Sequence, residues 1–162
     1  MKTKTLSLLS LLFLGLYLLS AASCNKKDDD NASECTGPAQ VNISGAVTGN
    51  YCLDEVTNFR FEDRINISVV STEDSGESVM LYASVEGEGV NLGPGTFECG
   101  GDNPGFIQLG YHGSNNEFYN SVTGTLTITS VSQSSFKGSF SVTAKGYYDD
   151  GQTATITGTI NY

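Results

Sequence analysis

Residues 136–144 read Phe-Lys-Gly-Ser-Phe-Ser-Val-Thr-Ala, in which every second side chain is apolar or glycine and the others are Lys, Ser or Thr. Two nearby runs repeat this pattern: Val122, Gly124, Leu126 and Ile128 before it, and Ala154, Ile156, Gly158, Ile160 and Tyr162 after it. Successive side chains of a β-strand point to opposite faces, so a period of two predicts one buried and one hydrated face. The three runs therefore predict a C-terminal meander of three antiparallel strands.

The earlier part of the chain follows the same pattern less strictly. Further strands are expected over residues 41–48, 59–69 (two strands), 79–85, 97 and 106–111. Connecting loops are rich in Gly, Asp, Glu and Ser, and the Asp-Gly pair within residues 147–152 is typical of a hairpin turn. The sequence therefore predicts a single all-β domain over residues 37–162, an antiparallel sandwich or a small barrel of about eight strands.

Three glycines occupy equivalent places in the predicted meander. Gly124, Gly138 and Gly158 each lie on the inward parity, two residues before a large apolar side chain. Glycine weakens a strand, so its repetition indicates a shared structural need. Curvature of the sheet is the expected reason, and the alternatives are room for an aromatic such as Tyr111 or Phe118, or a cavity for a ligand.

The first 23 residues have the features of a secretory leader. Lys2 and Lys4 supply a positive start, residues 6–19 are apolar, and residues 20–23 are small, as a leader peptidase requires. The apolar stretch of about 14 residues is shorter than the roughly 20 of a spanning helix, so we expect cleavage rather than membrane crossing. Cleavage before Cys24 leaves its thiol for fatty acylation of the palmitate type, which anchors the chain. An ordinary signal peptide is the alternative.

A short run of lysines and acids follows Cys24: Lys26, Lys27, Asp28, Asp29 and Asp30. This run resembles the Bacteroidota-type export signal, which sends lipoproteins to the outer face of the outer membrane. The resemblance implies a lipoprotein at the cell surface, held on an acidic tether over residues 24–36. The same composition is typical of a solvated, disordered spacer, and one segment can serve both as an export signal and as a spacer.

The charge of the mature chain limits its partners. Cleavage of the leader removes two lysines and no acid, so that six basic and 18 acidic side chains leave a net charge of −12. A phosphate backbone is bound by clustered Lys and Arg, whereas the basic residues here are scattered among carboxylates. We therefore expect no nucleic-acid partner.

Three cysteines besides Cys24 lie in a compartment where disulfides persist. One bridge with one leftover thiol is the simplest arrangement. A Cys52–Cys99 bridge is favoured because both residues lie at expected strand edges inside the folded region. Cys35–Cys52 is the close rival, since Cys35 lies where the tether ends.

The C-terminal half contains the residues Gly95-Thr96-Phe97, Tyr111, Phe118-Tyr119, Gly124 to Thr129, Lys137 to Ala144, and Gly158-Thr159-Ile160-Asn161. In these residues the chain resembles a family of small bacterial lipoproteins of uncharacterised function. The similarity covers roughly residues 92–162 and implies a single all-β domain on a lipid anchor, with no catalytic residues to transfer. The chain departs from this family at Cys52 and Cys99.

Chemistry-bearing residues are sparse. His112 is the only histidine and lies at an expected strand end. No other sequence motif of a catalytic nucleophile and its base accompanies it. The acids in residues 73–77 and 86–88 are expected to be solvated turn residues, although a cryptic carboxylate pair keeps a hydrolase as a low-ranked alternative. No metal or other cofactor is expected. Acidic loops, including Asp149 and Asp150, leave a bound calcium ion as an open alternative.

Aromatic residues near turns suggest recognition rather than catalysis. Candidate ligand-binding residues, as stacking platforms, are Tyr51, Tyr119, Tyr147 and Tyr148. Because Tyr147 and Tyr148 are adjacent, they would face opposite sides of a strand, so we expect at most one of them to join a flat platform while its neighbour packs inward. The sequence thus predicts a non-catalytic binding module for a glycan or a protein, and the alternative is an accessory or structural subunit of an envelope protein complex.

Overall fold

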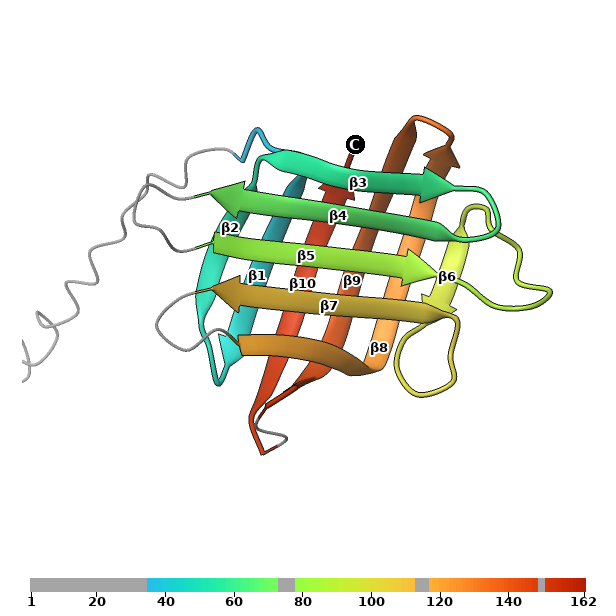
Figure 1. Cartoon of the computed structure of the whole chain (residues 1–162). Helices are drawn as coiled ribbons and strands as arrows, with labels where there is room; N and C mark the ends of the chain where they lie inside the picture. The colour runs from blue at the N-terminus through green and yellow to red at the C-terminus, as the bar shows by residue number, and fades with distance from the viewer. Residues whose placement is uncertain (1–34, 73–77, 113–116, 149–150) are drawn as a thin grey trace, which may run out of the picture. The chain divides into compact units, whose positions relative to one another are not determined.

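A computed structural model of the chain describes residues 35–72, 78–112, 117–148 and 151–162. These residues form ten β-strands and no helix, which confirms the all-β prediction (Figure 1). The strands are β1 (Ala39–Gly45), β2 (Gly49–Leu53), β3 (Glu55–Phe61), β4 (Ile65–Thr72), β5 (Ser78–Val85), β6 (Gly95–Glu98), β7 (Gly105–His112), β8 (Glu117–Ser132), β9 (Ser135–Gly146) and β10 (Thr153–Asn161).

The strands form one antiparallel sheet in the order β2-β1-β10-β9-β8-β7-β5-β4-β3, with β6 paired to β8 beside this path. Strands β8, β9 and β10 are consecutive neighbours, so the predicted meander is confirmed. In β9 the alternation is complete, because Phe136, Gly138, Phe140 and Val142 are buried and the residues that alternate with them are exposed. The strand expected over residues 41–48 ends earlier: β1 stops at Gly45, and the chain turns back into β2, which begins at Gly49.

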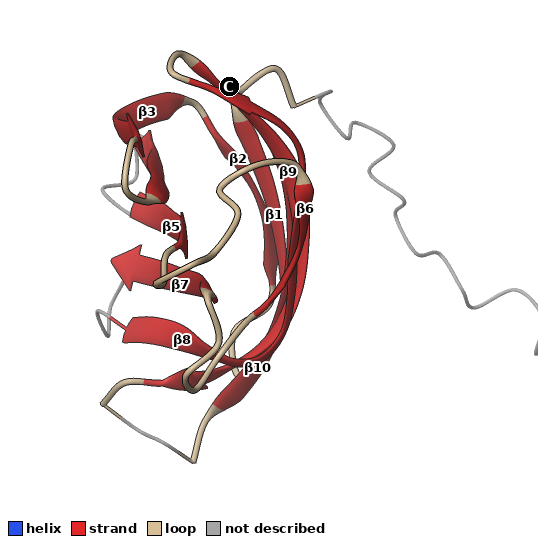
Figure 2. Cartoon of the chain, turned by 90° about the vertical axis from the view of Figure 1, so that its right-hand side faces the viewer, coloured by secondary structure: helices blue, strands red, loops and turns tan. Residues whose placement is uncertain are grey.

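The sheet folds over itself into two facing layers (Figures 1 and 2). We call β3, β4, β5, β7 and residues 117–121 of β8 the front sheet. We call β2, β1, β10, β9, β6 and the rest of β8 the back sheet, which runs steeply across the front one. Side chains from both layers fill the space between them, among them Leu81 and Ile107 from the front and Phe140 and Ile156 from the back.

Strand β8 passes from one layer to the other. Its first residues pair with β7 and its later ones with β6. The register with β9 shifts between Ser121 and Thr123, and Gly124 adopts a φ of 127°, which other residues avoid. This bulge reverses the parity: Ser121 faces inward before it and Leu126 after it, so Val122 is 37% exposed rather than inward as predicted.

The other two meander glycines allow the close approach of both a neighbouring strand and a phenylalanine ring. A Cβ on Gly158 would collide with the backbone oxygen of Gln40 and lie 2.6 Å from Cζ of Phe140, and one on Gly138 would lie 2.7 Å from the backbone oxygen of Thr127 and 3.1 Å from Cε1 of Phe136. Curvature therefore explains Gly124, whereas close backbone approach together with space for an aromatic ring explains Gly138 and Gly158. The rings are those of Phe136 and Phe140, not of Tyr111 or Phe118 as considered above.

A second corner brings the two ends of the sheet together. Only Asp54 separates β2 from β3, and its N–H donates to the carbonyl of Val70 on β4 (3.0 Å). Strand β2 also packs against β4 and β5. The result is a nearly closed, barrel-like sheet, which decides between the sandwich and the barrel left open by the sequence.

The disulfide joins Cys35 to Cys52, with their Cα atoms 5.4 Å apart, and Cys99 is free. The favoured Cys52–Cys99 pairing is therefore wrong and its rival is confirmed. The physical reason is the direction of the side chains, since Cys52 is on the exposed face of β2 while Cys99 is buried in the core. The bridge ties the start of the described fold to β2.

Candidate functional site: the outer face of the front sheet

Alternation along β5 and β7 decides which side chains reach the outer face of the front sheet. Leu81, Ala83 and Val85 are buried on the inward parity of β5. Tyr82 and Ser84, which alternate with them, therefore point toward the outer face. In β7 the buried Ile107 likewise separates two outward side chains, Phe106 and Gln108. The antiparallel register then places Ser84 beside Phe106 and Tyr82 beside Gln108.

An aromatic pair forms the centre of this face. The rings of Tyr82 and Phe106 meet edge to face, with centroids 6.2 Å apart and an angle of 61° between their planes. They line a hollow of about 340 Å³ together with Ser84, Glu86, Gly101, Asn103, Pro104 and Gly105. Ser84 is 3% exposed, and the side-chain amide of Asn103 donates to the carbonyl of Gly100 (2.8 Å), which holds the loop between β6 and β7 in place.

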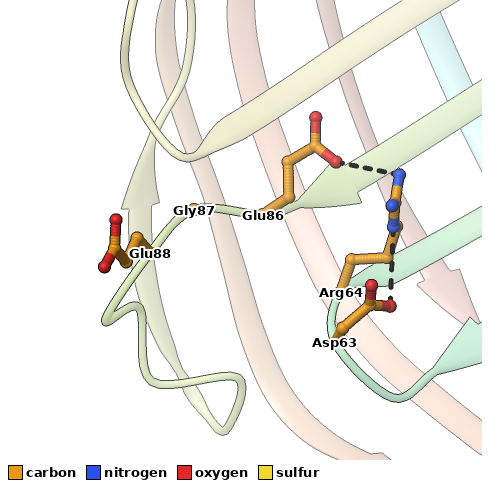
Figure 3. A pocket seen from close by; sticks show the side chains of 5 residues that line it. All are labelled: Asp63, Arg64, Glu86, Gly87 and Glu88. Carbon is orange, nitrogen blue, oxygen red and sulfur yellow. Dashed lines mark hydrogen bonds and ion pairs between the residues drawn. The ribbon is translucent and has the colours of Figure 1, made fainter.

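A second hollow of about 480 Å³ lies at the ends of β4 and β5 (Figure 3). It is lined by Asp63, Arg64, Glu86, Gly87 and Glu88. Arg64 forms ion pairs with Oε2 of Glu86 (3.3 Å) and Oδ1 of Asp63 (3.6 Å), while Glu88 lies beyond Gly87, apart from this pair. Glu86 lines both hollows, so the two are neighbours along one face.

Amide side chains continue the outer face next to the aromatic pair. The Nδ2 group of Asn58 donates to Oδ1 of Asn66 (3.3 Å), and Nε2 of Gln108 donates to Oδ1 of Asn120 (2.8 Å). The four residues lie on β3, β4, β7 and β8, so amides flank Tyr82 on both sides. Such groups offer both donors and acceptors to a polar ligand.

Tyr147 and Tyr148 lie just past the end of β9, where strand alternation no longer applies. They are 67% and 70% exposed, and their rings meet edge to face with centroids 5.2 Å apart. The expectation that one of them packs inward is therefore wrong. Tyr148 also contacts the ring of Phe118 on β8, at a centroid distance of 6.4 Å.

The other two predicted stacking residues are not on this face. Tyr119 is fully buried, and its hydroxyl donates to Oε1 of Gln152 (3.2 Å), so its prediction as an exposed platform is wrong. Tyr51 is half-buried and packs against Tyr111, with ring centroids 6.3 Å apart. Both residues point to the inside of the barrel, since Tyr51 shares the parity of buried Leu53.

Tyr82, Phe106 and Phe118 were not predicted from the sequence. Tyr82 stands in the run Val79 to Val85, where apolar residues on both parities conceal the outward position of an aromatic ring. The signal that identifies it is parity: it shares its face with Ser78 and Ser84. An aromatic residue on the same parity as the polar residues of a strand points to the outer face, where its ring is available for stacking.

The acidic loops are only partly described. Residues 73–77 and 149–150, considered for calcium and for a carboxylate pair, lie outside the described residues. Glu86 is the partner of Arg64. Over the described ranges, no group of three His, Cys, Asp or Glu side chains is close enough to hold a metal ion. His112 ends β7.

Cys99 is buried at the end of β6, below the corner made by β8. Its N–H donates to the carbonyl of Gly124 (2.9 Å). Burial, and to a smaller extent the Glu98 carboxylate, raise the pKa of the thiol from 9.0 to about 11, against the opposing effect of a hydrogen bond to the backbone of Leu126. The thiol is therefore protonated at neutral pH.

Cys24 and the run Lys26, Lys27, Asp28, Asp29 and Asp30 lie outside the described residues. In the part of the chain that is described, no helix has the length and apolar character needed to cross a bilayer. Comparison of the chain with known family models, curated proteins and solved structures finds no match.

Proposed function

We propose that the chain is a lipid-anchored lipoprotein of the outer membrane, displayed at the cell surface, whose β-domain is a non-catalytic binding module for a glycan. The observation that carries the proposal is the Tyr82–Phe106 pair. Its rings stand on an outer face and line a hollow together with the Ser84 hydroxyl, the Asn103 amide and the Glu86 carboxylate. Sugar rings present apolar C–H faces and peripheral hydroxyls, so aromatic rings next to hydrogen-bonding groups suit them.

The leader supports the anchored location. Cys24 is the acylation position, and the lysine and aspartate run after it is the proposed export signal. Eleven residues, 24–34, precede the disulfide-bonded Cys35, and a fully extended chain of that length reaches roughly 40 Å.

The binding test uses the full-length mature protein in detergent micelles on a glycan array, followed by calorimetry with the best ligand. Tyr82→Ala and Phe106→Ala are each expected to weaken binding roughly two- to tenfold, the range of one lost aromatic contact. Tyr162→Ala removes an exposed aromatic outside this face and is expected to leave affinity unchanged. An array without any bound glycan, together with an empty pull-down on whole cells, overturns the proposal.

A second candidate function is that of an accessory or structural subunit of an envelope complex. The exposed Tyr147–Tyr148 pair favours it, since tyrosine is enriched at the centre of protein interfaces. Cross-linking on intact cells is expected to capture a protein neighbour that is lost in Tyr147→Ala. Isolation of the chain as a free monomer from gently solubilised membranes counts against this candidate.

A hydrolase is the third candidate, with Glu86 and Glu88, two of the three carboxylates that line the larger hollow, as its carboxylate pair. A broad glycosidase and esterase screen tests it directly. The hydrolase hypothesis is supported only if the activity found in such a screen is lost in the Glu86→Gln and Glu88→Gln variants.

A further inference from the structure

The outer face of the front sheet carries a second aromatic pair in line with the first. Phe118 lies opposite Gly110 on β7, and Gly110 lies opposite Met80 on β5, two residues from Tyr82. Sheet geometry therefore places Phe118 two strands away from Tyr82 and two residues further along, a separation of roughly 12 Å. Tyr148 contacts the Phe118 ring from the turn after β9.

Between the two pairs, Gly110 of β7 contributes no side chain, and Met80 of β5 lies beside it in the same row, with its Cε 3.6 Å from the place of a Cβ on Gly110. A Cβ on Gly110 would lie 2.9 Å from Cε1 of Phe118, so the Phe118 ring lies over the bare backbone at this position. Gln108 and Asn120 fill the neighbouring row and are hydrogen bonded to each other. Aromatic rings and amides thus alternate from Phe106 to Tyr148, which suits a chain of several sugar rings better than a single ring.

The opposite end of this surface is acidic. The larger hollow is lined by three carboxylates, Asp63, Glu86 and Glu88, and by the guanidinium of Arg64. A second guanidinium, that of Arg60, pairs with Asp63 and with Glu62 (both 3.0 Å), so that four carboxylates face two guanidinium groups. Arg64 is held by Glu86 and Asp63, whereas Glu88 lies apart from that pair. The excess negative charge matches a cationic group on the ligand and opposes anionic sugars.

We infer that this surface binds a linear oligosaccharide that carries free ammonium groups. The two aromatic pairs provide two stacking positions, and the acidic hollow receives an ammonium group beside Glu88. The inference rests on the proposed function and specifies its ligand: a chain of amino sugars longer than a disaccharide. Within the smaller hollow, the buried Ser84 hydroxyl and the Asn103 side chain flank the ring that stacks on Tyr82.

Calorimetry on the full-length mature protein in micelles tests the inference with three probe series of matched linkage and length. These are oligomers of glucosamine, of N-acetylglucosamine and of glucose, from one to six units, at low and at high salt. Glucosamine oligomers are expected to bind most tightly, to gain affinity with each length step beyond two units, and to lose their advantage at high salt.

Two variants separate the two ends of the surface. Glu88→Gln is expected to reduce the preference for glucosamine about two- to fivefold, the range of an exposed ion pair, while glucose oligomers bind as before. Glu98→Gln, an exposed carboxylate on β6 of the back sheet, is the matched control. Tyr148→Ala is expected to weaken long chains roughly two- to tenfold and to leave monosaccharide binding unchanged.

The outcomes distinguish this inference from the proposed function. If glucosamine oligomers bind no better than their acetylated or neutral counterparts, or if sulfated oligosaccharides bind better, the ammonium position is refuted while glycan binding stands. If affinity is independent of chain length, or Tyr148→Ala weakens monosaccharides equally, the second stacking position is refuted. If none of the three series binds, the inference about the ligand is refuted, whereas the proposed function is overturned only if the glycan array and the pull-down are empty as well.

Discussion

The ring of Phe140 occupies the place that a side chain on Gly158 would take. The two residues are register partners on β9 and β10, and a Cβ on Gly158 would lie 2.6 Å from Cζ of the ring. Phe140 is buried among the side chains of the core, so the ring has little freedom to move aside. The glycine is therefore part of the packing of the core.

Gly158→Ala is expected to lower the free energy of unfolding by about 1–3 kcal/mol, the usual cost of overpacking. Chemical denaturation followed by tyrosine fluorescence measures it. Gly95→Ala is the matched control, because a Cβ there would lie 3.6 Å from the Phe97 ring, an ordinary contact. In the double variant Gly158→Ala with Phe140→Leu, the two costs should be less than additive. Full additivity would show that the strain comes from the backbone oxygen of Gln40 on β1, which a Cβ on Gly158 would also meet, and not from the ring.

Removal of the Cys35–Cys52 bridge is expected to destabilise the domain by about 3 kcal/mol, because the bridge closes a loop with a sequence separation of 17. The variants are Cys35→Ser and Cys52→Ser, and their denaturation curves should coincide with that of the reduced wild type. Peptide mapping without reduction should recover the Cys35–Cys52 pair. A Cys52–Cys99 peptide instead would contradict the structure.

The Cys99 thiol is expected to resist alkylation at pH 7.5 in the folded protein and to react rapidly in denaturant. Its pKa is raised to about 11 in the fold, so the fold favours the protonated form. The linked stability is fully present below the unfolded pKa, near 9, and is lost as the pH rises toward 11. Denaturation curves between pH 8 and 11 measure this loss, which should be smaller in Cys99→Ser. Equal alkylation rates in buffer and denaturant would show an accessible thiolate.

Cys24→Ala in the full-length chain is expected to abolish fatty acylation and to move the protein from the detergent phase to the aqueous phase on partitioning. Mass spectrometry of the mature N-terminus checks the lipid and the cleavage position. Replacement of Asp28, Asp29 and Asp30 by Asn is expected to keep the lipid but to reduce digestion by protease added to intact cells. An unacylated wild-type chain with its leader intact would refute the anchor.

Much of the fold could be predicted because its strands alternate so strictly. Residues 136–144 and 154–160 have one apolar and one polar parity, and β9 and β10 follow them closely. The strand containing Val122 was predicted with the wrong parity at its start, because a bulge at Ser121 shifts the pattern by one residue. A bulge depends on the partner strand, so one strand's sequence does not reveal it.

The candidate site was harder to predict because it is assembled from several strands. Tyr82, Phe106 and Phe118 are far apart in the sequence, and only the register β5-β7-β8 brings them to one face. Tyr119, chosen for its place near a turn, is instead a core residue. Exposure of an aromatic side chain depends on which face its neighbours bury, and that is a property of the packed sheet.

The amino-acid sequence by itself determined the all-β class, the C-terminal meander and the apolar faces of β9 and β10, because a period of two is a local property of each strand. The tertiary structure decided the pairing of Cys35 with Cys52, the closure of the sheet at Asp54 and the gathering of aromatic rings on the front face. These features depend on side chains that meet only after the sheet has bent at β8, where Gly124 and the bulge let one strand serve both layers.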